Sequence, residues 1–136
     1  MSIDFQNKKG FICDMDGVLY HGNRLLPGAV EFINWLQKNG REDLFLTNNS
    51  GMTPRELHQK LERLGVNVPE EHFYTSALAT AEFLRIQAPG CSAFVIGEAG
   101  LLNALYDAGI TMNDVNPDYV VIGEGRSYSL ETLTKA

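Results

Sequence analysis

This sequence has few cysteines, no strongly basic segment and no long apolar run. Its 136 residues include two cysteines, Cys13 and Cys91, which lie far apart in apolar stretches. We expect both to be small buried side chains in a reducing compartment, so no disulfide is predicted. No stretch approaches the roughly 18 apolar residues of a membrane span, and the N-terminus lacks the apolar core of a secretory signal. These absences predict a cytoplasmic protein that does not bind a membrane.

The charge balance argues against nucleic acid as a partner. The net charge is −6, and we find no cluster of basic residues beyond Lys8-Lys9. Binding to a phosphate backbone usually requires a basic surface. The composition, 44% apolar and 21% charged, is typical of a globular protein. The length suits one domain, or one domain and part of another.

Short apolar runs alternate with segments of helical periodicity. The predicted strands are Gly10–Met15, Leu44–Thr47, His72–Thr75, Ala93–Gly97 and Tyr119–Gly123. The predicted helices are Gly28–Asn39, Pro54–Leu64, Ala77–Gln87, Gly100–Ala108 and the opening of a helix near Ser129. This alternation predicts βαβ units and an α/β fold with a mostly parallel sheet. The charged stretch Arg41-Glu42-Asp43 is expected to shorten the second strand.

The helix that begins at Pro54 has the clearest local signals. Thr53 is a candidate N-cap, and Glu56 completes a capping box with it. The breaker cluster Ala88-Pro89-Gly90 is the best candidate domain boundary. A last helical pattern begins near Leu130 and stops within two turns, so we expect the sequence to be a piece of a longer chain.

Two carboxylates, Asp14 and Asp16, stand at the end of the first predicted strand. Their period-two spacing points both side chains to the same side, and Gly17 then releases the chain into a turn. Two such charges about 4 Å apart repel by roughly 4 kcal/mol at an effective dielectric constant of 20. Protonation of one carboxylate or a divalent cation relieves this cost. The pair can therefore serve as nucleophile and proton donor with magnesium nearby, or it can be two turn-forming residues of a solvated loop.

The second predicted strand also ends in polar residues. Thr47-Asn48-Asn49-Ser50 follows an apolar run and precedes the capped helix. A hydroxyl and backbone N–H groups beside a helix N-terminus can bind a phosphate, although the same residues also form ordinary turns. Ligands of open parallel sheets bind beyond the carboxyl ends of the strands, so the two strand ends together favour a phosphoryl-transfer site.

The stretch Asp14-Met15-Asp16-Gly17-Val18 resembles the first motif of the haloacid dehalogenase superfamily, whose phosphatases use an aspartate nucleophile. Other segments resemble the NagD-like branch, which contains nucleotide monophosphatases and nitrophenylphosphatases. They are Tyr20–Ala29, Thr47–Ser50, Tyr74–Ala77, Val95–Glu98 and Asn116–Glu124. The resemblance implies a three-layer Rossmann-like parallel sheet. Residues 1–88 would be the N-terminal part of this core, and residues 89–136 the beginning of an inserted α/β cap.

The resemblance also implies a role for each matching residue. Asp14 would attack phosphorus and form an aspartyl phosphate, and Asp16 would protonate the leaving group and then activate water. Thr47 and the backbone N–H of Asn48 would bind the phosphoryl group, while Val18–Leu26 would form a flap. Asp14 and the backbone carbonyl of Asp16 would hold Mg²⁺. The implied activity is magnesium-dependent hydrolysis of a small phosphomonoester, such as a nucleoside monophosphate or a sugar phosphate.

Two parts that the resemblance implies do not appear in the sequence. One is a lysine that neutralises the phosphate, and the other is a later acidic segment that completes the magnesium site. After Lys60 the one lysine is Lys135, in a predicted helix of the cap. Asp114 and Asp118 precede a strand, so we interpret them as turn residues. We expect the chain alone to be weakly active or inactive.

Two other classes of protein remain open as alternatives. A receiver-type signalling module would need an aspartate at the end of the third strand and a lysine at the end of the fifth, where Thr75-Ser76 and Glu124 stand. A truncated interaction protein would self-associate through the exposed face of the half-core.

Several further polar residues have weaker signals. His21, His58 and His72 match no metal-ligand spacing; His21 could approach substrate from the flap, and His58 is expected to be solvated. Gly97-Glu98-Ala99-Gly100 is predicted to be a tight turn into a helix, since the glycine pattern of a dinucleotide loop is absent. The residues after the last strand that could contact substrate from the cap are Glu124, Arg126 and Tyr128.

Overall fold

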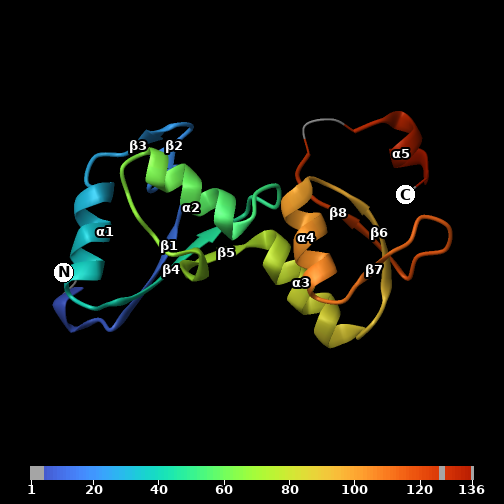
Figure 1. The fold of residues 1–136 in the computed structure, drawn as a ribbon, viewed down its shortest axis with the longest axis horizontal. Coiled ribbons are helices and arrows are strands. Elements are labelled where there is room, and N and C mark those ends of the chain that lie inside the picture. The colour runs from blue at the N-terminus through green and yellow to red at the C-terminus, as the bar shows by residue number, and fades with distance from the viewer. Residues whose placement is uncertain (1–4, 126–127, 136) are drawn as a thin grey trace. The chain divides into compact units, whose positions relative to one another are not determined.

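The computed structural model describes residues 5–125 and 128–135, and Figure 1 labels their helices and strands. Contacts within the chain divide it into two compact units. The first comprises the described residues up to Thr47 together with Leu57–Tyr74. The second comprises Asn48–Glu56 and the described residues from Thr75 onward. Both combine helices with parallel strands, which confirms the predicted α/β fold class.

The first unit is built on a three-stranded sheet with the order β1-β4-β5. Its strands are β1 (Gly10–Asp14), β4 (Glu42–Thr47) and β5 (Phe73–Thr75). Its helices are α1 (Ala29–Lys38), most of α2 (Pro54–Arg63) and two short 3₁₀ helices, η1 (Phe5–Asn7) and η2 (Glu70–His72). β1 and β4 are parallel, with Asp14 opposite Leu46. The acidic end of β1 therefore lies beside the end of β4.

The two faces of β1 differ in how they are covered. Phe11 packs edge-on against Phe32 and Trp35 of α1, with ring centroids 6.1 and 5.5 Å away. Ile12 points to the opposite face and is 73% exposed. On the neighbouring strand Phe45 is fully buried. The core of the first unit thus lies on the α1 face at β1, and the other face of this strand is open.

The start of α2 has the predicted capping box. Thr53 Oγ1 accepts a hydrogen bond from the backbone N–H of Glu56 at 3.2 Å, and the Glu56 carboxylate accepts one from the backbone N–H of Thr53 at 2.7 Å. Both donors would otherwise lack a partner within the helix. Farther along α2, Leu57 and Leu61 are buried, as expected for an apolar stripe.

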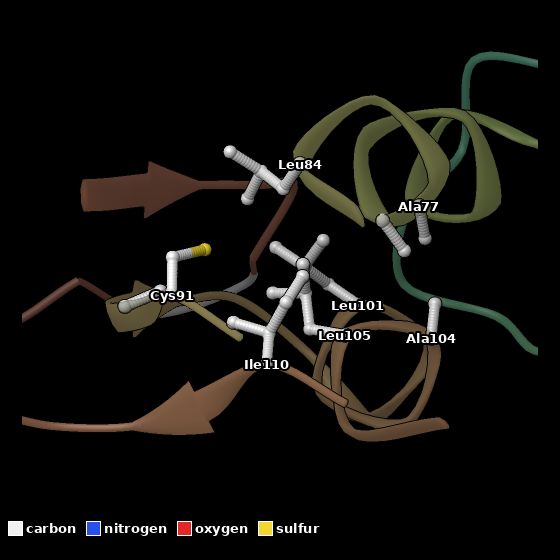
Figure 2. Packing of buried hydrophobic residues seen from close by; sticks show 9 residues of the cluster. Ala77, Leu84, Cys91, Leu101, Ala104, Leu105 and Ile110 are labelled. Atoms are coloured by element: carbon white, nitrogen blue, oxygen red, sulfur yellow. The ribbon is translucent and has the colours of Figure 1, made fainter. Parts of the chain in front are cut away.

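The second unit is built on another three-stranded sheet, with the order β7-β6-β8. The central strand β6 (Ser92–Ile96) is parallel to both β7 (Thr111–Met112) and β8 (Tyr119–Ile122). Its helices are α3 (Ser76–Gln87), α4 (Ala99–Asp107) and α5 (Leu130–Lys135). Figure 2 shows its core, in which side chains of α3 and α4 meet those around β6. The buried members are Ala77, Ala81, Leu84, Cys91, Ala93, Leu101, Ala104, Leu105 and Ile110.

Three short strands were not predicted. β2 (Tyr20–His21) and β3 (Arg24–Leu25) form an antiparallel hairpin within the expected flap, and β7 pairs with β6. Two-residue strands are too short to show an alternating pattern, so sequence periodicity cannot reveal them.

The expectation that Arg41-Glu42-Asp43 shortens the second strand is wrong. β4 begins at Glu42, which lies opposite Gly10. The Asp43 carboxylate is 2.9 Å from Nδ1 of His72. Because the strand end is accessible and Asp43 has this partner, the charged residues do not prevent pairing. His58 is likewise not simply solvated, since its half-buried ring is 2.7 Å from the Val68 carbonyl.

Both cysteines have free thiols. Among the helices of the described segments, we find none with the length and apolar character needed to cross a membrane.

Candidate active site

The turn after β1 presents two carboxylates above a buried side chain. Asp14 is the last residue of the strand, and both Asp14 and Asp16 are exposed, whereas Met15 between them is fully buried. The alternation of a strand continues through this stretch, so Met15 anchors the turn in the core. Gly17 has φ +79°, a conformation that glycine adopts without strain, and its N–H donates to the Tyr20 carbonyl at 2.7 Å. The local backbone thus fixes the positions of the Cα atoms from which both carboxylate side chains extend.

Two hydroxyl groups approach one oxygen of Asp16. Tyr20 Oη donates to Oδ2 at 3.3 Å, and Thr47 Oγ1 donates to the same oxygen at 3.4 Å. Tyr20 lies at the start of the flap hairpin and Thr47 at the end of β4. Thr47 is 5% exposed, so a buried hydroxyl lies beside the carboxylate. The structure therefore brings Asp16 and Thr47 together, as the two strand ends predicted.

Tyr20 is a further residue of this site, for which the sequence predicted only a place within the flap. It is 1% exposed, and burial, followed by the charge of Asp16, raises its pKa well above the ordinary value. The phenol therefore stays protonated and remains a hydrogen-bond donor. Nζ of Lys60, on α2, lies 3.8 Å from the centroid of the Tyr20 ring. The sequence contains no signal that relates Lys60 to Asp16, because the two interact only through the Tyr20 side chain.

The block after Thr47 forms a turn within the second unit. Asn49 Oδ1 accepts hydrogen bonds from the backbone N–H groups of Gly51 and Met52, both at 2.9 Å. The Asn48 carbonyl accepts one from Ser76 Oγ at 2.8 Å. Asn48 itself is exposed and belongs to the second unit, unlike Asp14, Asp16 and Thr47. Its predicted role in phosphate binding stays a prediction.

The donor set at the end of β1 consists of oxygen atoms. Among residues 5–125 and 128–135, no group of three or more His, Cys, Asp or Glu side chains could hold a metal ion. Magnesium keeps several of its waters and often takes only one or two protein carboxylates. Asp14 and the carbonyl of Asp16 are of the right chemical kind, and they fit a partial magnesium shell. Burial, followed by the Asp14 charge, raises the pKa of the neighbouring Cys13 thiol and favours its neutral form.

The first residues after the last strand, β8, lie beside the turn that contains Asn49 and Ser50. Glu124, Glu98 and Asn49 line a pocket of about 260 Å³, and the backbone N–H of Glu124 donates to Ser50 Oγ at 2.7 Å. Tyr128 Oη donates to the Gly123 carbonyl at 2.6 Å. Arg126 lies outside the described residues. The stretch Gly97–Gly100 is the predicted turn, since β6 ends at Ile96 and α4 begins at Ala99.

Comparison with known proteins identifies the class to which this geometry belongs. A family model described as haloacid dehalogenase-like hydrolase matches residues 11–111. The chain belongs to this family, as the motif at Asp14 predicted.

Several relatives are named as phosphatases. The chain is 48% identical over 128 residues to the ribonucleotide monophosphatase NagD of Escherichia coli K12, covering 94% of this chain and 51% of that protein. It is 46% identical to the dihydroxyacetone phosphatase of Corynebacterium glutamicum, covering 93% and 46%. It is 40% identical to the acid sugar phosphatase of Staphylococcus aureus USA300, covering 94% and 50%. The solved structure of E. coli NagD matches with a TM-score of 0.88 at 47% identity, covering 94% and 51%. The chain spans about half the length of these relatives.

Proposed function

We propose that this chain carries the nucleophile and the proton donor of a magnesium-dependent phosphomonoester hydrolase. The observation that supports this most directly is the end of β1, where Asp14 and Asp16 are exposed above buried Met15 and Thr47 lies 3.4 Å from Asp16. A phosphoryl group needs a nucleophile on one side and a proton donor near its leaving oxygen. Two carboxylates two residues apart, at the end of β1 and in the turn after it, supply both.

The reaction proceeds in two displacements. A carboxylate oxygen of Asp14 attacks phosphorus while the bond to the ester oxygen breaks, and Asp16 gives its proton to that oxygen. The alcohol leaves, and Asp14 carries the phosphoryl group. Asp16, now ionised, takes a proton from a water that attacks phosphorus, which releases phosphate and restores Asp14. Asp16 thereby regains its proton, so the cycle balances.

The phosphoryl group needs donors on its non-reacting oxygens. The Thr47 hydroxyl and the backbone N–H of Asn48 are the groups that we assign to this role. Asp14 and the carbonyl of Asp16 would hold Mg²⁺, which would supply positive charge that lowers the repulsion between the phosphate and the carboxylates.

The substrate is a small phosphate ester. The names of three relatives that are 40–48% identical to this chain point to a ribonucleotide monophosphate, dihydroxyacetone phosphate and a sugar phosphate. These differ in the alcohol and share the phosphomonoester. The specificity for the alcohol therefore depends on parts outside the Asp14 turn, and we assign it to a cap that begins within residues 89–136. Residues 1–88 would then be the N-terminal part of the catalytic core.

No observation favours the receiver alternative. The described strands form two three-stranded sheets and one hairpin instead of the single five-stranded sheet of a receiver. Self-association through an open face of the half-core stays a prediction. Exposed Ile12 is compatible with it, and light scattering of the purified chain tests it.

The function is tested by asking whether turnover depends on Asp14. Because the chain spans about half of its relatives, we expect little or no activity from the chain alone. It is therefore assayed with Mg²⁺ and an aryl phosphate both alone and mixed with a polypeptide that corresponds to the remaining half of E. coli NagD. We expect turnover in the mixture, and we expect Asp14→Asn to lower it by roughly a thousandfold or more.

The matched control is Asp107→Asn, which removes a carboxylate from the exposed end of α4. It should leave turnover unchanged. Equal turnover with Asp14→Asn would contradict the proposal. So would an inactive mixture under conditions in which the two halves of NagD itself restore activity to each other.

A further inference from the structure

We propose that Tyr20, with Lys60 over its ring, is a positioning residue that holds the Asp16 carboxylate in the orientation needed for proton transfer. This inference rests on the proposed function, in which Asp16 is the proton donor. It gives a role to two side chains on different elements, Tyr20 on the flap hairpin and Lys60 on α2.

Tyr20 is attached by backbone hydrogen bonds to the turn that carries Asp16. The Gly17 N–H donates to the Tyr20 carbonyl at 2.7 Å, and the Tyr20 N–H donates to the Met15 carbonyl at 3.3 Å. Asp16 and Tyr20 also form an isolated β-bridge. The phenol and the carboxylate that it contacts thus belong to one closed turn. Their separation is set by short local bonds, and motion of the rest of the flap changes it little.

The two hydroxyl donors near Asp16 point to the same carboxylate oxygen. Tyr20 Oη and Thr47 Oγ1 both donate to Oδ2 of Asp16, at 3.3 and 3.4 Å. An exposed aspartate side chain without such contacts rotates among several staggered positions. Two donors on one oxygen select a single rotamer in the chain without substrate, and when the Thr47 hydroxyl turns to a bound phosphoryl group the Tyr20 phenol keeps that rotamer. We therefore assign Oδ1, the other oxygen, to the proton that passes to the leaving group.

Lys60 lies over the Tyr20 ring. Its ammonium lies 3.8 Å from the centre of the Tyr20 ring, within the range of a cation–π interaction. Tyr20 is 1% exposed, so the ring is shielded from water on its other sides. A cation over the ring withdraws electron density from the phenol and strengthens its O–H as a donor. Lys60 therefore acts on Asp16 through Tyr20 and does not touch the carboxylate itself.

A purely structural role predicts something different. If Tyr20 only filled the core and Lys60 only covered it, removal of the phenol oxygen would leave the ring packing and the Asp16 side chain as they are. Tyr20→Phe separates the two cases, because it removes one oxygen and keeps the ring. Lys60→Met removes the charge with a similar length of side chain, and Lys60→Arg keeps the charge.

The test measures the rotamer of Asp16 in the chain itself. NMR couplings across three bonds, from the Asp16 carboxyl carbon to the backbone nitrogen and carbonyl carbon, report the side-chain torsion. We expect one rotamer in the unsubstituted chain, averaging over several in Tyr20→Phe, partial averaging in Lys60→Met and recovery in Lys60→Arg. The controls are Tyr74→Phe and Lys38→Met, which change exposed residues of β5 and α1.

Several results would overturn the inference. If Asp16 already averages over several rotamers in the unsubstituted chain, the inference is wrong and no variant is needed to show it. Unchanged couplings in Tyr20→Phe remove the role of the phenol. If Tyr20→Phe loses the dispersed amide spectrum of a folded protein, half-buried Lys60 carries the test, and unchanged couplings in Lys60→Met then overturn the proposal. None of these readouts depends on catalysis.

Activity supplies a second signature in the mixture that turns over substrate. Proton donation matters most for a poor leaving group, so Tyr20→Phe should lower kcat about tenfold with phenyl phosphate and less than about twofold with 4-nitrophenyl phosphate. A general loss of structure would lower both alike, which contradicts the positioning role. Failure of the proposed function is distinguished by Asp14→Asn: if that variant keeps its activity, the phosphatase mechanism fails whatever Tyr20→Phe does.

Discussion

The two compact units use the same architecture and end their strands in different ways. Each has a three-stranded sheet with parallel pairing and a hydrophobic core between sheet and helices. In the first unit β1 ends in Asp14, followed by exposed Asp16. In the second unit β6 and β8 end at Ile96 and Ile122, which lie opposite each other, and a Gly-Glu pair follows each strand.

Glycine at these positions in the second unit is required by packing. A Cβ atom at Gly97 would lie 2.9 Å from Leu101 Cδ2, and one at Gly123 would lie 2.6 Å from the same atom. The first turn of α4 therefore packs directly onto the two strand ends. In the first unit the buried side chain of Met15 fills the space below the turn, and the carboxylates remain accessible above it. Both units therefore place exposed carboxylates after their strand ends, but these follow a buried methionine in the first unit and glycines packed closely against α4 in the second.

The largest effect on stability is expected from truncating a buried leucine in the core of each unit. Leu36 and Leu105 are fully buried, one in each unit, and truncation of either to alanine should cost about 2–5 kcal/mol. If the units are separate cores, Leu105→Ala should accelerate amide hydrogen exchange mainly in the second unit and Leu36→Ala mainly in the first. Leu102→Ala, at a 38% exposed position of α4, serves as the control. Equal loss of protection throughout in both variants would mean that the units unfold together.

A smaller effect is expected from filling a strand end of the second unit. Gly123→Ala places a methyl group 2.6 Å from Leu101 Cδ2 and 2.8 Å from Ser50 Oγ, so the free energy of unfolding in urea should fall by about 1–3 kcal/mol. Gly10→Ala is the matched control in β1, because a Cβ there has ordinary contacts of 3.5 Å or more. If the two substitutions cost the same, close packing does not explain the glycine at position 123.

The smallest effect concerns the other ends of β6 and β8. Asp118 accepts hydrogen bonds from the backbone N–H and the hydroxyl of Ser92, at 2.7 and 2.8 Å, and these bonds lower its pKa, the backbone bond most. Because the pKa is lower in the folded state, the stabilisation is present above the unfolded value of about 3.9 and is lost as the pH falls through the folded value.

Thermal unfolding measured between neutral pH and about pH 3 checks this prediction. Asp118→Asn cannot titrate, so its Tm should depend less on pH in the acid range than that of the unsubstituted chain. Asp107→Asn removes an equal charge without these bonds and controls for net charge. An unchanged slope in Asp118→Asn would show that the Ser92 bonds do not carry the pH dependence.

Local sequence signals predicted the elements well. The five predicted strands and five predicted helices are present, with ends that differ by at most two residues. The capping box of Thr53 and Glu56 needs only a four-residue stretch, so no distant contact is required to predict it. The short strands of the flap hairpin and β7 were missed because their pairing depends on distant backbone and not on a pattern of their own. The start of β4 was misjudged because His72, which contacts Asp43, comes from a different element.

The character of the end of β1 can be derived from a few neighbouring residues. Asp14, buried Met15, Asp16 and Gly17 follow from a strand that alternates and then turns, and these are properties of adjacent residues. In contrast, Thr47 and Tyr20 share one oxygen of Asp16, and Lys60 lies over the Tyr20 ring, as a result of how the chain folds. Those contacts join β4, the flap hairpin and α2. They form because each side chain is buried or held at a point fixed by the packing of its own element, which no local pattern in the sequence records.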